Sequence, residues 1–243
     1  KASLPSVAVV GQDQTMPDAT PNPNPNAATV VDFWFDPICP FAWLTSRWLV
    51  EVASQRSMTI NWHLMSLGIL NASPDAPPPL QEYTEVSRGP VRLFASVRAE
   101  HGDEVIGELY TSVGTALHRE GGTFEPSKTA AGADFLSTMT ACIQSSPDAI
   151  AKSLADLGLP ATHLAAPQKA SWDASIEQSH ERVPVGEQRR ELIGVPTISI
   201  NGAPGFFGPV LTELPAPDRA AELFDALTTL LTEPGFYEIK RVS

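Results

Sequence analysis

A cysteine between a strand-like and a helix-like segment is the residue best placed for covalent chemistry. Cys39 follows the β-branched and aromatic run Thr29–Phe35 and precedes Pro40–Gln55, whose apolar residues recur at helical spacing. Because the N-terminal end of a helix stabilises negative charge, we expect the pKa of this thiol to fall well below its ordinary value of about 8.5. The sequence therefore predicts a cysteine nucleophile. The alternative is an unreactive core cysteine.

A second thiol is missing from the position where a dithiol motif would place it. The residue three positions after Cys39 is Ala42. The other cysteine, Cys142, ends a helix-like stretch and is predicted to be a small core residue. It would resolve a disulfide on Cys39 only if the fold brought the two Cα atoms within about 7 Å. We therefore expect chemistry by one sulfur.

Four neighbours of Cys39 are predicted to contact the substrate. Asp36 can orient a proton or solvent, or it can serve only as a turn residue at the end of the strand. Pro40 fixes the backbone at the helix start, and Phe41 and Trp43 supply aromatic surface. The aromatic residues nearest Cys39 predict an apolar pocket for a flat or extended unsaturated ligand.

A proline opens the segment where the strand pattern returns after a long helical region. Pro196 precedes the alternating residues 197–200, and proline is expected only at the first residue or the edge of a strand. We predict a cis Val195–Pro196 bond that presents the backbone of Val195 to a ligand beside Cys39.

The histidines offer acid–base groups but no metal-ligand spacing. The sequence contains His63, His101, His118, His163 and His180. Without a cysteine cluster or paired spacing we expect no metal site. His101 and His118 fall in the helical region and are predicted to act as catalytic acid–base groups, the alternative being surface or core histidines.

The composition is that of an acidic globular protein. The chain has 243 residues, 42% of them hydrophobic and 18% charged, and its net charge is −12. This charge argues against nucleic acid or an anionic membrane as a partner. No apolar run approaches the roughly 18 residues of a membrane span. With two cysteines we expect a cytoplasmic protein and not a disulfide scaffold.

The order of the predicted elements indicates a thioredoxin-like α/β fold, βαβ…ββα, with a large helical insertion. Residues 1–28 form a Pro/Asn-rich tail, 29–70 and 193–243 the thioredoxin-like domain, and 71–192 the insertion. A strand from Met58 to Leu67 completes the βαβ unit. Helical signals dominate from Pro90 to about Leu192, Asn201-Gly202 predicts a hairpin, and an apolar helical face spans Asp218–Thr232.

These motifs together resemble the DsbA family of thioredoxin-fold proteins. The resemblance is carried by Phe33–Trp43, by Gly194–Thr197 and by the helical block between them. Within the family the chain most resembles actinobacterial DsbA-like mycothiol-dependent reductases, over residues 29–243. The similarity continues through His101-Gly102, Leu109-Tyr110, Gly114-Thr115, Leu117-His118, Phe207–Val210 and Phe236–Arg241. It implies that Cys39 is the nucleophile and Pro196 the cis proline, with Ala42 departing from the family's second cysteine.

Of three functions, the sequence favours the first, a cysteine-dependent isomerase, and the other two are alternatives. The first is cis–trans isomerisation of a conjugated double bond by reversible addition of Cys39, which needs no cofactor. The related folds of kappa-class glutathione transferases and 2-hydroxychromene-2-carboxylate isomerases imply that such a scaffold can perform non-redox thiol chemistry. The second is mycothiol-dependent reduction or transfer, in which an external thiol resolves the adduct. The third is a non-catalytic binding module. The expected partner is a small molecule, either free or attached to a carrier protein or coenzyme A.

Overall fold

The computed structural model describes residues 28–131, 133–185 and 192–241. All of the predicted tail except its last residue lies outside this part of the chain. The strands are β1 (Thr29–Phe35), β2 (Met58–Leu64), β3 (Thr197–Ile200) and β4 (Phe206–Phe207). The α-helices are α1 (Pro40–Gln55), α2 (Leu67–Leu70), α3 (Pro78–His101), α4 (Glu104–His118), α5 (Ala133–Gln144), α6 (Pro147–Asp156), α7 (Asp173–Glu181) and α8 (Pro217–Leu231). Short 3-10 helices are η1 (Glu125–Lys128), η2 (Ala161–Gln168) and η3 (Ala170–Trp172).

The sheet has the predicted mixed topology. Its strand order is β2-β1-β3-β4, with β2 parallel to β1, and with β3 antiparallel to both β1 and β4. The turn after β3 uses Asn201 and Gly202, both with positive φ (51° and 76°), which confirms the predicted hairpin. β1 lies inside the sheet, and its carboxyl end leads directly into the Cys39 turn.

Helix α1 begins and ends at the predicted residues because local signals define both the cap and the buried face. Cys39 is the N-cap and Pro40 the first helical residue, where no N–H is required. Trp48 and Leu49 are buried on the same helix. The indole of Trp48 donates to the carbonyl of Ala220 at 3.0 Å, which attaches α1 to α8.

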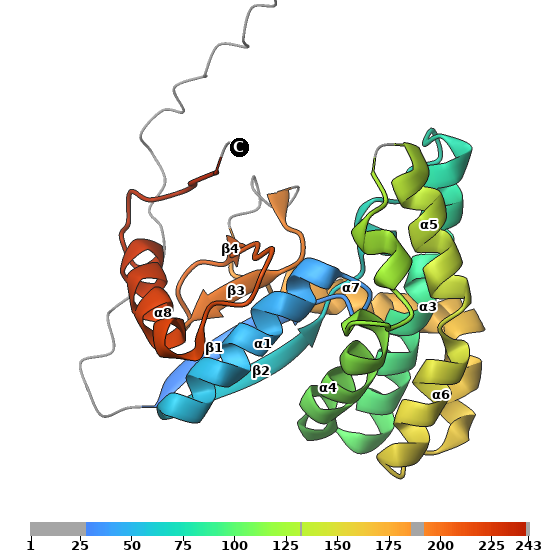
Figure 1. The fold of residues 1–243 in the computed structure, drawn as a ribbon, viewed down its shortest axis with the longest axis horizontal. Coiled ribbons are helices and arrows are strands. Elements are labelled where there is room, and N and C mark those ends of the chain that lie inside the picture. Colours follow the sequence, from blue (N-terminus) through green and yellow to red (C-terminus); the bar gives the residue numbers. More distant parts are fainter. Residues whose placement is uncertain (1–27, 132, 186–191, 242–243) are drawn as a thin grey trace, which may run out of the picture.

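The helical block lies beside the sheet (Figure 1), and its first long helix starts earlier than predicted. The helical signal was expected from Pro90, but α3 begins at Pro78 and includes Pro90 in its interior. Prolines are compatible with the first turn of a helix, and Pro78 and Pro79 occupy that turn in α3. α4 buries an apolar face that includes Leu109, Val113 and Leu117, and α6 begins at Pro147 directly after Ser146.

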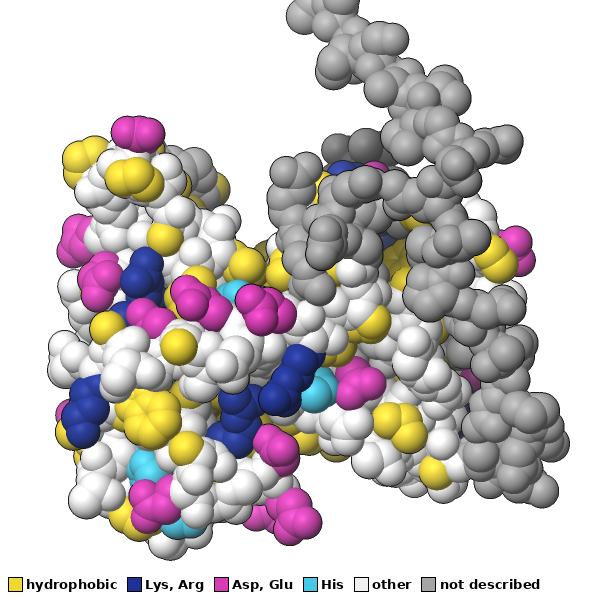
Figure 2. Space-filling model, turned by 180° about the vertical axis from the view of Figure 1, so that it is seen from behind, with side chains coloured by type: hydrophobic (Ala, Val, Ile, Leu, Met, Phe, Trp, Pro, Cys, Tyr) yellow, Lys and Arg dark blue, Asp and Glu magenta, His cyan; other side chains and the backbone are white. Residues whose placement is uncertain are grey.

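The described surface seen from behind mixes charges of both signs. In Figure 2, Lys and Arg side chains alternate with Asp and Glu side chains over this face and do not form a continuous basic stripe there. None of the helices in the described residues is long and apolar enough to cross a membrane.

Candidate active site

Cys39 lies where the end of β1, the start of α1 and the Pro196 loop meet. Its Sγ accepts the backbone N–H of Ala42 at 3.5 Å and lies 3.9 Å from the carbonyl oxygen of Val195. The Val195–Pro196 bond is cis, as predicted. The sequence therefore predicted correctly that the Cys39 turn and the Val195–Pro196 loop, 156 residues apart, meet at the sulfur.

The expected lowering of the thiol pKa is wrong for this structure. Cys39 is only 4% exposed, and burial raises its pKa to about 12. The N–H of Ala42 favours the thiolate, while the charge of Asp36 opposes it. The helix terminus is present, but removing the sulfur from water outweighs its effect. In this structure the high pKa keeps the Cys39 thiol protonated at neutral pH.

Asp36 is buried directly before the nucleophile. Its Oδ1 accepts the N–H of Ile38 at 3.1 Å, and its Oδ2 accepts the N–H of Leu67 at 2.8 Å. Burial raises the pKa of this carboxyl to about 7, although the two N–H groups act in the opposite direction. Asp36 therefore holds the turn that carries Cys39, and it is able to exchange a proton near neutral pH.

His118 reaches the same turn from α4. Its Nε2 lies 2.9 Å from the carbonyl oxygen of Pro37, so this nitrogen carries a hydrogen and donates it. The ring also lies nearly parallel to Trp43, with centroids 5.9 Å apart. Burial lowers the pKa of His118 to about 4, which keeps the imidazole neutral. In this structure His118 positions the turn.

His101, the other histidine predicted to be catalytic, is placed elsewhere. It ends α3 and pairs with His163 of η2, the two Nε2 atoms being 3.2 Å apart. The helical block thus brings His118, and not His101, to the turn before Cys39.

Cys142 is also a free cysteine and lies on α5 of the helical block. It is 4% exposed, belongs to the hydrophobic core and lies beside the backbone N–H of Ser127. The prediction of a small core residue is confirmed.

The two aromatic residues predicted beside Cys39, Phe41 and Trp43, differ in exposure, and a third aromatic residue, Tyr110, packs near Trp43. Phe41 is 41% exposed, whereas Trp43 is partly buried and lies against α4 at Gly114. A Cβ at Gly114 would come within 2.3 Å of the Trp43 ring, so only glycine permits this approach. Tyr110, also on α4, stacks on Phe35 with centroids 3.9 Å apart.

Tyr110 adds a polar group to this otherwise apolar surface. Its hydroxyl is buried, with the Ser46 side chain as a neighbour. Burial raises the pKa of Tyr110, and the contact with Ser46 lowers it by less. The hydroxyl is therefore protonated. The dipeptide Leu109-Tyr110 is part of the family resemblance in the sequence, but the proximity of Tyr110 to the Cys39 thiol follows only from the packing of α4.

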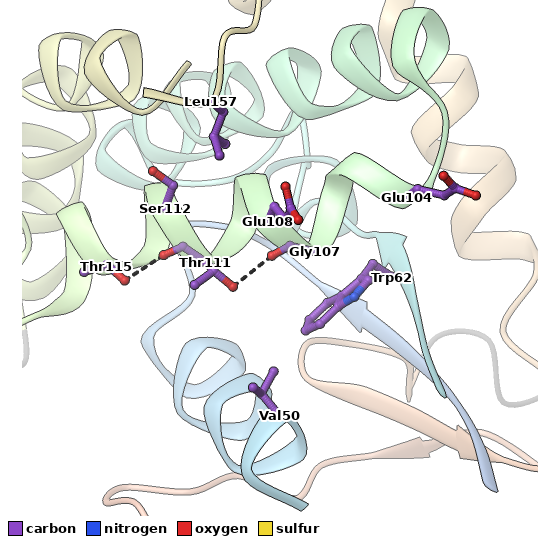
Figure 3. Close-up of a pocket in the computed structure, with 9 residues that line it drawn as sticks. All are labelled: Val50, Trp62, Glu104, Gly107, Glu108, Thr111, Ser112, Thr115 and Leu157. Atoms are coloured by element: carbon purple, nitrogen blue, oxygen red, sulfur yellow. Dashed lines mark hydrogen bonds between the residues drawn. The ribbon is translucent and has the colours of Figure 1, made fainter. Parts of the chain in front are cut away.

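A groove of about 600 Å³ lies apart from the sulfur, between α1 and α4. Figure 3 shows Val50 of α1 and Trp62 of β2 facing the residues of α4 across it. Its lining consists of Val50, Trp62, Glu104, Gly107, Glu108, Thr111, Ser112, Thr115 and Leu157. None of the predicted site residues is among them. We place the candidate active site at Cys39 because its thiol, the buried carboxyl of Asp36 and the cis-proline loop meet there.

Comparisons with known proteins identify the family to which the chain belongs. The family described as "Rv2466c-like: Mycothiol-dependent nitroreductase Rv2466c" matches residues 38–241. A Mycobacterium tuberculosis protein described as "Uncharacterized protein Rv2286c" is 29% identical over 214 residues, which are 88% of this chain and 82% of that protein.

Similar solved structures have low sequence identity. A putative protein disulfide isomerase from Nitrosomonas europaea is 12% identical, with a TM-score of 0.47, over 84% of this chain and 98% of that one. Reduced DsbG from Mycobacterium tuberculosis is 15% identical, with a TM-score of 0.43, over 88% and 91%. The chain has a thioredoxin-like α/β fold with a large helical block, and because the family model matches most of its length, it belongs to the Rv2466c-like family of mycothiol-dependent nitroreductases, which are enzymes of oxidoreductase type.

Proposed function

We propose that this protein is a monothiol enzyme in which Cys39 attacks a small electrophilic substrate and mycothiol supplies the second thiol. The observation that carries the proposal is the environment of the sulfur. Its Sγ is bonded to the N–H of Ala42, a fully buried residue that replaces the resolving cysteine. Cys142 is not joined to Cys39 and lies on α5 beside the backbone N–H of Ser127. Membership of a mycothiol-dependent family supports an external thiol as the resolving group.

Activation of the thiol requires that the site opens or that a substrate replaces part of its dry surroundings. The pKa values of Cys39 and Asp36 are both raised by burial, to about 12 and about 7. Water or a polar substrate group that enters lowers both values, and the lower pKa of Cys39 increases the fraction of thiolate near neutral pH. The hydroxyl of Tyr110 can then donate to negative charge that develops on the substrate.

With a disulfide substrate, the reaction proceeds by two exchanges. The Cys39 thiolate forms a bond to one substrate sulfur, the substrate S–S bond breaks, and the other sulfur leaves as a thiolate. A mycothiol thiolate then attacks the substrate sulfur of the mixed disulfide and releases Cys39 as a thiolate. A second mycothiol reduces the product disulfide, so two thiols are oxidised for each two-electron reduction.

A second candidate is the isomerisation of a conjugated double bond. The observation that favours it is the apolar and aromatic surface beside Cys39, formed by Trp43 and Tyr110 among others, together with the missing thiol at Ala42. The thiolate adds to the alkene, the former double bond rotates, and elimination restores both the alkene and the thiol. No electrons are gained or lost, and no mycothiol is consumed.

Turnover assays with and without mycothiol separate these candidates. Wild type, Cys39→Ser and the matched control Cys142→Ser are incubated with a mixed disulfide, a nitroaromatic compound and a conjugated enone. Substrate and oxidised mycothiol are quantified by mass spectrometry. We expect turnover that requires mycothiol, consumes two thiols for each pair of electrons, and is lost only in Cys39→Ser.

Other outcomes replace this proposal. Isomerisation that is lost in Cys39→Ser but indifferent to mycothiol supports the second candidate. Ligand binding of equal affinity in wild type and Cys39→Ser, without turnover of any substrate, indicates a binding module and contradicts both enzymatic candidates.

A further inference from the structure

A cluster of three potential metal ligands lies outside the Cys39 site. Glu100 and His101 end α3, and His163 comes from η2. The two imidazole Nε2 atoms are 3.2 Å apart. The Glu100 carboxylate oxygens lie 3.6 Å from Nε2 of His163 and 3.8 Å from Nε2 of His101. Packing therefore brings together two nitrogens and a carboxylate from segments that are far apart in sequence.

The hydrogen bonds around His163 fix its tautomer. The Ser96 hydroxyl donates to the carbonyl of Leu93 at 2.8 Å, so its single hydrogen is already used. The same oxygen lies 2.9 Å from Nδ1 of His163, and Nδ1 must therefore carry a hydrogen and donate it. A neutral imidazole with a hydrogen on Nδ1 has a free lone pair on Nε2. This lone pair is directed toward His101.

This arrangement has the form of an oriented metal ligand. Metal-bound histidines usually donate their second ring N–H to a neighbouring acceptor, which fixes the ring and its tautomer. In a tetrahedral zinc site with bonds of about 2.1 Å, neighbouring ligand atoms are about 3.4 Å apart. The separations of 3.2, 3.6 and 3.8 Å in the cluster lie close to this value.

The cluster is accessible from solvent on one side. The side chain of His163 is 4% exposed, whereas those of His101 and Glu100 are 29% and 58% exposed. An ion can therefore enter over the two ligands of α3 and meet a buried, oriented imidazole. The net charge of −12 also favours the approach of cations.

We propose that Glu100, His101 and His163 bind a divalent transition-metal ion of the zinc class, with water completing the coordination. Two imidazole nitrogens and one carboxylate oxygen suit Zn²⁺ better than Mg²⁺ or Ca²⁺, which prefer oxygen ligands. The ion joins the C-terminal end of α3 to η2 and stabilises the helical block. Sequence spacing gave no indication of this site, because His163 is 62 residues from His101.

Metal titration of the untagged full-length protein tests the proposal. After treatment with a chelator, Zn²⁺ is added in competition with a chromophoric chelator, and Co²⁺ binding is followed by visible absorption. We expect one ion per chain and at least a tenfold loss of affinity in His101→Ala. Ser96→Ala should cost about 10- to 100-fold, because the orienting hydrogen bond is lost. Saturating Zn²⁺ should raise the melting temperature of the wild type by about 5 °C and that of His101→Ala much less.

Two control variants exclude other ligands. His63→Ala removes a different histidine, which lies on the sheet. Its Nε2 is 2.8 Å from Oδ1 of Asp32, so it too pairs with a carboxylate. Cys39→Ser removes a competing thiol. Both should bind Zn²⁺ like the wild type. Equal affinity in wild type and His101→Ala, loss of binding in Cys39→Ser, or binding of less than about a tenth of an equivalent overturns the proposal. In the last case the two histidines form only an N–H···N hydrogen bond.

Discussion

Cys39 and Cys142 are equally inaccessible to solvent, but their neighbours differ. Both side chains are 4% exposed, both lie beside a backbone N–H, and burial raises the pKa of both thiols. Around Cys39 there are also a buried carboxyl, Asp36, and the carbonyl of Val195 on the cis-proline loop. Burial alone therefore does not distinguish a core cysteine from a nucleophile. The difference is made by groups that can accept a proton, contact a ligand and admit a partner thiol.

The largest expected effect comes from exchanging each sulfur for oxygen. Cys39→Ser should lower kcat/KM by about 10³-fold or more, because a serine hydroxyl is a far weaker nucleophile at neutral pH. Cys142→Ser should leave kcat/KM within about twofold and should cost only about 1–2 kcal/mol of stability. Steady-state kinetics and urea unfolding measure both. A comparable loss of activity in Cys142→Ser would remove the distinction between the two regions.

The next effect concerns the acid that only the Cys39 region has. Asp36→Asn should lower kcat/KM by about 10- to 100-fold and abolish the increase in rate as pH rises through about 7. Rate profiles between pH 5 and 9 test this. An unchanged profile would show that Asp36 only holds the turn.

The same variant has a signed effect on stability. In the folded protein the pKa of the Asp36 carboxyl is about 7, raised from 3.8. Burial of this carboxyl therefore has no cost in ionisation below about pH 4, and stability is lost as pH rises from about 4 through about 7. The stability of the wild type relative to Asp36→Asn should therefore fall over this interval, by at most about 4 kcal/mol. Urea unfolding at a series of pH values measures the difference. A difference that stays constant or changes in the opposite direction contradicts burial as the cause of the raised pKa.

Restoring the missing thiol sharpens the contrast further. Ala42→Cys should form an intramolecular disulfide with Cys39 under oxidising conditions, and it should reduce the dependence of turnover on mycothiol by about tenfold. Thiol counting after oxidation and the mycothiol dependence of the rate are the measurements. Ala42→Ser is the matched control, since it adds a polar atom without a second sulfur.

A smaller effect is expected at the support for the turn. His118→Gln retains a hydrogen-bond donor toward Pro37 but loses the ring beside Trp43, and it should lower kcat/KM by a few fold. His118→Phe retains a ring and loses the donor. If both variants match the wild type in activity and in urea unfolding, His118 does not position the turn.

The sequence predicted those parts of the site that depend on local pattern. The cap and first turn at Cys39-Pro40 and the cis bond before Pro196 are marked by residues that restrict the backbone. The hairpin at Asn201-Gly202 follows from the same kind of signal. These predictions required only neighbouring residues.

The rest depends on long-range packing. The direction of the Cys39 pKa shift follows from how completely the surrounding segments exclude water, and no local motif contains that information. The pairing of His101 with His163 and the approach of Tyr110 to the thiol likewise require the contacts of α3 and α4. The error at Pro90 was local, since a proline inside a helix was read as its beginning.

The central claim is that Cys39 is the one sulfur that forms an adduct with an external thiol. Intact-mass spectrometry after incubation with oxidised mycothiol at about pH 8 tests it directly. We predict a single mycothiol adduct on wild type and Cys142→Ser, removed by reduction, and none on Cys39→Ser. An adduct that persists in Cys39→Ser, or that disappears in Cys142→Ser, would contradict the account.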